Sequence, residues 1–107
     1  MELLIVMTSI DNEKKANKLA KRMVRDKLAC CVSISSPVCS HYVWQDKMEQ
    51  QCEYLMLIKT IPDNLDILKA FLQDNHPYKI PEIISFRAED CNRAYLDWAM
   101  KQISVVS

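Results

Sequence analysis

The spacing of apolar residues along the chain switches between two periods, and these periods predict where strands and helices lie. Residues 3–8 form a continuous apolar run, which is typical of a buried central strand. Over residues 12–27, apolar side chains recur every three or four positions, with lysines and arginines between them. This pattern predicts an amphipathic helix, and Ser9 or Asp11 is expected to cap its start.

A long hairpin is predicted in the middle of the chain. Residues 29–34 and 38–44 are extended segments, and Ser35-Ser36-Pro37 between them predicts a turn or kink, because proline cannot donate to a sheet ladder. Gln45-Asp46 has the length of a two-residue hairpin loop, after which residues 48–60 form the returning strand. Since the chain lacks the glycine usual in such a loop, Asp46 is expected to adopt a positive φ.

The second half of the chain repeats the order of the first. A helix is predicted from Pro62-Asp63 to His76-Pro77, because the residue before a proline avoids the α region. A short strand over residues 81–87 and a helix over residues 92–103 follow. The order β-α-β-β-α-β plus a final helix predicts one α+β domain over residues 1–107. Its expected fold is ferredoxin-like, an antiparallel sheet with helices on one face.

Composition excludes several classes of protein. With no glycine in 107 residues, the chain lacks the dinucleotide fingerprint, the P-loop and the Gly-x-Ser-x-Gly elbow, which need close backbone approach. Fourteen basic residues balance fourteen acidic ones, so charge provides no drive for nucleic-acid binding. No apolar run reaches the roughly 18 residues of a membrane span, and the first residues are too short a run for a secretion signal. We expect neither nucleic acid nor membrane as a partner.

The cysteines indicate a cellular compartment. They number five and include no Cys-x-x-Cys pair, whereas a secreted disulfide framework is usually even and spaced. We therefore expect a cytoplasmic protein with reduced thiols. Cys30 and Cys31 fall inside an apolar strand, where cysteine usually packs as a small hydrophobe.

Soft metal ligands are one candidate site. Cys39 and His41 are two positions apart on a strand and share a face. A two-residue loop at Gln45-Asp46 places Cys39 opposite Cys52, so that these side chains offer ligands suited to copper or zinc. A cross-strand coincidence is the simpler explanation of this group.

Residues 76–83 form the densest group of polar side chains. His76, Tyr78 and Glu82 supply an imidazole, a phenol and a carboxylate from a connection that Pro77 and Pro81 make rigid. A binding site needs this kind of rigid presentation. A structural explanation is equally good: His76 closes the preceding helix and Glu82 caps a neighbouring element, without a binding site.

Five short motifs span most of the chain, from about residue 3 to residue 98. They are Leu28-Ala29-Cys30-Cys31-Val32, Tyr42-x-Trp44, Leu57-Ile58-Lys59-Thr60, His76-Pro77-Tyr78-x-x-Pro81-Glu82-Ile83 and Tyr95-Leu96-x-Trp98. Each alone is weak, but in this order they closely resemble the CutA divalent-cation-tolerance proteins. The resemblance implies a ferredoxin-like homotrimer whose sheets join across subunits, similar in architecture to the PII signalling proteins. It also implies a link to tolerance of copper and other divalent cations.

The resemblance further implies candidate copper ligands. In some members the proposed ligands are a sulphur residue that ends the first strand and consecutive histidines before the Pro-Tyr pair. Met7, Asn75 and His76 stand at these positions here. His76 and Met7 are therefore the expected metal residues, and the thioether of Met7 favours Cu(I) over Cu(II).

Together these observations predict a non-enzymatic, cytoplasmic homotrimer of divalent-metal tolerance that binds copper or another divalent cation weakly. A rival function is that of a PII-like regulatory trimer with a small ligand between subunits. Its pocket would use Tyr42, Trp44, Lys59, Tyr78 and Glu82. A second rival is a trimeric anchoring or interaction protein, as in animal relatives that anchor a membrane esterase, and a third is an enzyme that uses the same pocket.

Overall fold

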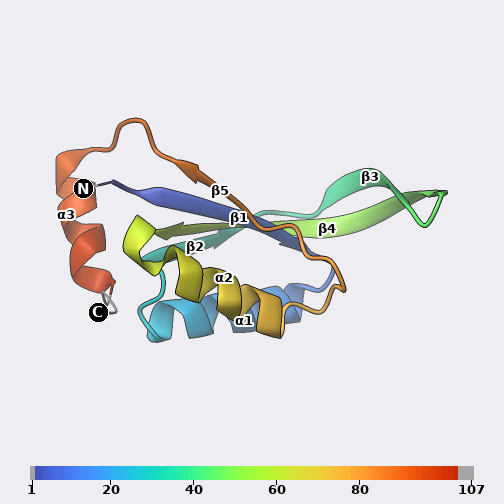
Figure 1. The fold of residues 1–107 in the computed structure, drawn as a ribbon, viewed down its shortest axis with the longest axis horizontal. Helices are drawn as coiled ribbons and strands as arrows, with labels where there is room; N and C mark the ends of the chain where they lie inside the picture. Colours follow the sequence, from blue (N-terminus) through green and yellow to red (C-terminus); the bar gives the residue numbers. More distant parts are fainter. Residues whose placement is uncertain (1, 104–107) are drawn as a thin grey trace.

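The computed structural model describes residues 2–103 and has the predicted order of helices and strands, except that the second strand of the predicted order is divided into two strands, residues 31–34 and 38–44 (Figure 1). The elements are β1 (Leu4–Ile10), α1 (Glu13–Arg25), β2 (Cys31–Ile34), β3 (Val38–Trp44), β4 (Lys47–Thr60), the 3-10 turn η1 (Pro62–Asn64), α2 (Leu65–Asn75), β5 (Ile84–Arg87) and α3 (Arg93–Gln102). Residues 1 and 104–107 of the predicted domain lie outside the described residues.

All strand pairs in the sheet are antiparallel. β1 lies between β4 and β5, with Val6 opposite both Ile58 and Ser85, and β2 completes the order β2-β4-β1-β5. β1 is the central strand, and its residues Leu4 and Val6 are buried while Ile5 and Met7 are partly buried. This order and direction are those of the ferredoxin-like fold, so the predicted fold class is confirmed.

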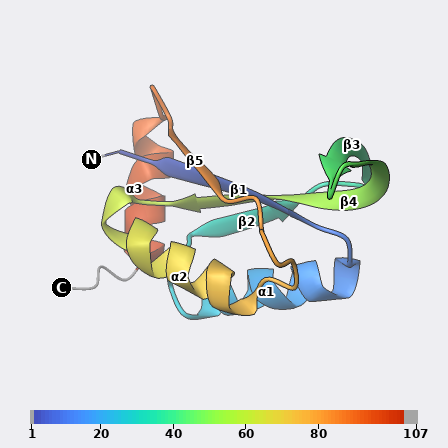
Figure 2. The ribbon, with the colours of Figure 1, turned by 45° about the vertical axis from the view of Figure 1, so that its right-hand side comes forward.

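Helices α1 and α2 cover one face of the sheet (Figure 2). Alternate residues of the central strands point toward the helices and form the core with residues from both helices. Fully buried members of this core include Val6, Met23, Ile58, Leu68 and Leu72. None of the helices among residues 2–103 combines the length and the apolar composition needed to span a bilayer.

The start of α1 differs from the prediction. Asn12, not Ser9 or Asp11, is the N-cap, and its side chain accepts a hydrogen bond from the Lys15 N–H at 2.9 Å. Ser9 still belongs to β1, and the Asp11 carboxylate instead accepts a hydrogen bond from Gln51. The prediction was wrong because strand β1 continues to Ile10.

Helix α3 packs across the end of the sheet that lies farthest from the hairpin tip (Figure 1). Ala99 and Ile103 there join a second apolar cluster with Leu3, Cys30 and Ile61. Burial of Cys30 raises the pKa of its thiol, so that it stays in its apolar, protonated form. This agrees with a packing role for that cysteine.

The hairpin loop is as predicted. Trp44 pairs with Lys47, so Gln45 and Asp46 alone connect β3 to β4. Both loop residues have positive φ, 51° at Gln45 and 65° at Asp46. Two consecutive left-handed residues are the backbone of a type I′ turn, which matches the right-handed twist of the strands.

A bulge separates β2 from β3. Three residues (35–37) lie between Ile34 and Val38, whereas only two lie between their partners Met56 and Glu53. Ser35 bridges the gap: its N–H donates to the Leu55 carbonyl, and its hydroxyl accepts from the Leu55 N–H, both at 2.9 Å. The predicted kink at Ser35-Ser36-Pro37 is therefore confirmed, and the bulge lies outside the register between Cys39 and the loop.

The hairpin beyond this bulge projects from the helix-covered body (Figure 1). The longest dimension is 45 Å, and the radius of gyration of 14.5 Å exceeds the roughly 13 Å expected of a compact chain of this length. Apolar side chains near the tip are exposed, with Val43 at 62% and Met48 at 76% of full accessibility.

Candidate functional site

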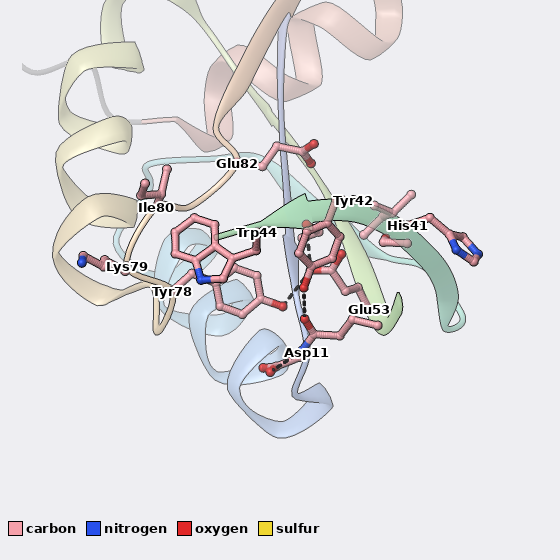
Figure 3. A pocket seen from close by; sticks show the side chains of 13 residues that line it. Asp11, His41, Tyr42, Trp44, Glu53, Tyr78, Lys79, Ile80 and Glu82 are labelled. Carbon is pink, nitrogen blue, oxygen red and sulfur yellow. Dashed lines mark hydrogen bonds between the residues drawn. The ribbon is translucent and has the colours of Figure 1, made fainter. Parts of the chain in front are cut away.

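A cavity of about 740 Å³ lies where the hairpin leaves the body, and we call it the hairpin-base cavity. It is lined by Ser9, Asp11, Ser40, His41, Tyr42, Trp44, Gln51, Glu53, Leu55, Tyr78, Lys79, Ile80 and Glu82. These residues come from the end of β1, from both hairpin strands and from the segment after α2 (Figure 3). Residues far apart in the sequence therefore form one site.

Strand alternation explains how the hairpin contributes its side chains. Tyr42 and Trp44 are two positions apart on β3 and share a face. Directly paired residues project on the same face, and Tyr42 pairs with Glu49, so Gln51 and Glu53 of β4 share that face as well.

Two short hydrogen-bonded chains organise the polar side of the cavity (Figure 3). The Tyr78 hydroxyl donates to Glu53 Oε2 at 2.7 Å, and the Ser9 hydroxyl donates to the same oxygen at 3.3 Å. The Tyr42 hydroxyl donates to Gln51 Oε1 at 2.6 Å, and Gln51 Nε2 donates to Asp11 Oδ2 at 2.9 Å. The tyrosine rings are thus held by their hydroxyl groups.

The cavity carries an excess of negative charge. Asp11, Glu53 and Glu82 line it together with a single lysine, Lys79. Glu53 is only 6% exposed, and the ion pairs described within residues 2–103 all lie elsewhere on the surface. Burial and the hydrogen bond to Glu53 raise the pKa of Tyr78. Burial and the nearby Glu53 carboxylate also raise the pKa of Tyr42.

His76 stands beside this cavity and fixes the segment that follows α2. It is the C-cap residue of α2 and is 8% exposed. Its Nε2 lies 2.8 Å from the Ser9 carbonyl, and the Tyr78 N–H donates to Nδ1 at 3.1 Å. Because a carbonyl only accepts and an N–H only donates, the ring is in the neutral tautomer with the proton on Nε2. Both ring nitrogens are therefore engaged within the chain.

Met7 does not share this environment. Its neighbours Val6 and Thr8 are fully buried on the helix-covered side, so Met7 faces the other side of the sheet. His76, by contrast, ends a helix of the covered side. Within residues 2–103, no three His, Cys, Asp or Glu side chains come together to hold a metal ion. The His, Cys, Asp and Glu side chains of this described part therefore do not form a chelating metal site within one chain.

The hairpin cysteines have the predicted register. Cys39 pairs directly with Cys52, and Cys39 Sγ lies 3.5 Å from His41 Nε2. Gln50 Nε2 also donates to Cys39 Sγ at 3.0 Å, and both cysteines are free thiols. In the part of the chain that the structure describes, they and His41 do not form a three-ligand metal group.

Four of the five expected pocket residues line the hairpin-base cavity: Tyr42, Trp44, Tyr78 and Glu82. Lys59 lies elsewhere in the single chain, about 20 Å along β4 from Glu53 at the usual rise per residue. Its ammonium group donates to the Tyr95 hydroxyl at 3.4 Å, a contact with α3 that raises the pKa of Lys59.

Glu53, the buried acid of the site, was not among the residues predicted from the sequence. Its orientation could have been predicted from the sequence. Counting back from the two-residue loop gives the face of the hairpin on which Glu53 lies, in the same way as it gives the pairing of Cys39 with Cys52. The partners of Glu53, in contrast, lie 25 and 44 positions away along the chain. No local pattern relates them.

A ferredoxin-like subunit with a long projecting hairpin and a polar cavity at its base is the class that the fold and site define. The model of the family described as "CutA1 divalent ion tolerance protein" matches residues 4–102. The chain therefore belongs to the CutA1 divalent ion tolerance family.

Relatives and solved structures agree with this assignment. The Thermus thermophilus "Divalent-cation tolerance protein CutA" is 36% identical over 88% of this chain and 91% of its own length. "Protein CutA" of Mus musculus is also 36% identical, over 90% of this chain, but the chain spans about half (54%) of the mouse protein. The crystal structure of CutA1 from Oryza sativa has a TM-score of 0.93 and 31% identity, and the match covers 97% of this chain and 95% of that one.

Proposed function

We propose that this chain is a non-enzymatic divalent-cation tolerance protein that acts in the cytoplasm as a homotrimer. The observation that carries the proposal is the match to proteins named for divalent-cation tolerance along nearly the whole chain. Those names favour cation tolerance over a PII-like regulatory or anchoring role. The free thiols among residues 2–103 agree with a reducing compartment.

Exposed apolar surface supports the trimer. The hairpin tip exposes Val43 and Met48, and all four residues of the edge strand β5 are exposed in the single chain. Unpaired edges and exposed apolar strands are aggregation hazards unless another chain covers them. Pairing of these edges with neighbouring copies removes the hazard.

For the cation itself we propose weak binding of copper or another divalent cation at a site that includes His76 and Met7. A metal at Nδ1 of His76 must displace the Tyr78 N–H, and loss of such a bond costs about 1 kcal/mol. Met7 faces the other side of the sheet, so local rearrangement or a neighbouring copy has to complete the ligand set. Both features limit the affinity.

Growth of a bacterial strain that lacks its own family protein tests the function. Expression of this chain should raise the copper concentration that halves growth, relative to the empty vector. A Leu68→Asp variant, which places a charge in the fully buried core, serves as the unfolded control and should give no protection. Equal growth of the vector and wild-type strains at every copper, zinc and cobalt concentration would contradict the proposal.

A further inference from the structure

The hairpin-base cavity has a charge and an aromatic lining that cation tolerance at His76 does not use. We propose that this cavity binds a small organic cation with ammonium groups, held by Glu53, Asp11 and Glu82 against the ring of Trp44. The volume of about 740 Å³ is that of a small-molecule site, since such sites typically enclose roughly 300–1,000 Å³.

Glu53 is the most deeply buried acidic side chain of the cavity. It is more than nine-tenths buried, and its two described hydrogen bonds come from the neutral hydroxyls of Ser9 and Tyr78. Both bonds reach Oε2, so Oε1 is left for a ligand among the contacts described for residues 2–103. A buried carboxylate without a cation is unfavourable, and an incoming cation relieves that penalty.

The surrounding charges also favour a cation. Asp11 and Glu82 add two carboxylates, against one ammonium group from Lys79 and the imidazole of His41. The pKa of Tyr42 is raised by burial and then by the Glu53 carboxylate, which agrees with a negative potential in the cavity. Lys59, which would have favoured an anionic ligand, lies at the other end of β4 beside Tyr95.

The aromatic lining suits an organic cation. Trp44, Tyr42 and Tyr78 all line the cavity (Figure 3). The faces of such rings attract ammonium groups, and tryptophan does so most strongly. Hydrogen bonds from both tyrosine hydroxyls fix their rings in place before a ligand arrives. Little ordering entropy then remains to be lost on binding.

A bare metal ion fits the same cavity poorly. Hard divalent cations need several oxygen ligands around one point. Within residues 2–103, however, no three His, Cys, Asp or Glu side chains converge on one point. An alkyl diammonium ion differs in that its charges are separated by a flexible chain, so it can reach carboxylates that lie apart.

Calorimetric titration of the assembled protein with 1,4-diaminobutane tests the proposal, with 1,4-butanediol as the neutral probe of matched length. We expect the diamine to bind at least tenfold more tightly than the diol. A second readout is the fluorescence of Trp44, one of the two tryptophans of the chain. In a Trp98→Phe background Trp44 is the single tryptophan, and its fluorescence should change on titration with the diamine.

Glu→Gln variants, which remove one negative charge each, test whether the diamine binds in the hairpin-base cavity. Glu53→Gln should weaken diamine binding at least tenfold. Glu82→Gln should weaken it at least threefold, a smaller effect because Glu82 is exposed. Glu89→Gln, which removes an equal charge from an exposed loop outside the cavity, should leave it unchanged. Glu82→Gln keeps the test valid if Glu53→Gln fails to fold.

Three outcomes overturn the proposal. Equal affinity for the diamine and the diol shows that charge plays no part. Absence of binding by either probe at millimolar concentration shows that the assembled protein leaves no such site, as when a second copy fills the cavity. Binding of Cu²⁺ or Mg²⁺ that requires Glu53, without binding of the diamine, assigns the cavity to an inorganic ion. The growth assay with copper is independent of all three.

Discussion

Among residues 2–103, three residues with positive φ show how this chain turns without glycine. They are Lys27 (59°), Gln45 (51°) and Asp46 (65°). Lys27 follows the C-cap of α1, where the Asp26 N–H donates to the Arg22 carbonyl and the Leu28 N–H donates to the Met23 carbonyl, both at 2.9 Å. Such helix ends usually carry glycine, because a Cβ atom disfavours the left-handed conformation.

Lys27→Gly should therefore stabilise the protein. Relief of the left-handed strain exceeds the greater flexibility of glycine in the unfolded chain, so we expect the free energy of unfolding to rise by about 0.5–1 kcal/mol. Lys21→Gly, an exposed position inside α1, is the matched control and should lower it by about 1 kcal/mol. Urea denaturation measures both; a loss of stability in Lys27→Gly would contradict the prediction.

Tyr78 should make stability depend on alkaline pH. Its pKa is raised in the folded protein, chiefly by burial and then by the hydrogen bond to Glu53. Above about pH 10 the unfolded chain loses this proton while the folded protein keeps it, so stability falls as pH rises. At neutral pH, Tyr78→Phe should cost about 1–2 kcal/mol because it removes the hydrogen bond to Glu53.

The stability difference between wild type and Tyr78→Phe should consequently shrink between pH 9 and 11, a window set by the ordinary phenol pKa of about 10. Urea midpoints at several pH values give this difference. Tyr54→Phe, a phenol packed against the helix-covered core, controls for the loss of a hydroxyl elsewhere on β4. A constant or growing difference for Tyr78→Phe would refute the linkage.

At the scale of the elements, the hairpin gives the sharpest test. Direct pairing places the Cβ atoms of Cys39 and Cys52 about 4.5–5.5 Å apart, close to the roughly 3.5–4.5 Å that a disulfide spans. Both side chains are exposed in the single chain and are free thiols. Mild oxidation should join them with little movement of the backbone.

Peptide mapping by mass spectrometry after diamide treatment should find a Cys39–Cys52 bond that dithiothreitol reverses. Cys30, which is buried, should remain unmodified under the same conditions. Cys52→Ser should abolish the bond while leaving the hairpin intact. A bond from Cys39 to any cysteine other than Cys52 would show that the register differs in solution.

Local patterns sufficed to predict the elements. Apolar spacing gave β1 and α1, and the loop length gave the hairpin register, because these features depend on residues within a few positions. Element ends were less accurate. A 3-10 turn at Pro62–Asn64 precedes α2, and β5 begins at Ile84 rather than residue 81, where proline cannot donate to the ladder.

The site was only partly predictable because most of its contacts join residues that are far apart in the sequence. Tyr78 and Glu82 attracted notice because they stand in one short rigid segment. Glu53 did not, since its partners come from other elements, and the bond from His76 to the Ser9 carbonyl spans 67 positions. The family resemblance predicts His76 as a metal residue, which remains a proposal, whereas the tertiary contacts show that its ring anchors the segment after α2.

At the scale of the whole molecule, a single chain leaves much apolar surface uncovered. Ile84 and Phe86 of β5 and the hairpin tip are exposed, and the hairpin extends past the helices (Figure 1). Burial of such surface contributes roughly 25 cal/mol per Å², so this exposed apolar surface supports the proposed association of copies. The proposed trimer and the proposed cation site are linked, because one chain, over residues 2–103, does not supply a complete ligand set.

Native mass spectrometry of the reduced protein with one equivalent of copper per chain tests both together. We expect a mass of three subunits with copper bound, and His76→Ala should retain the trimer while losing at least tenfold in copper affinity. The chain has one other histidine, so His41→Ala is the matched control and should bind copper as wild type does. A monomer at micromolar concentration, or copper binding that His76→Ala leaves unchanged, would contradict the account.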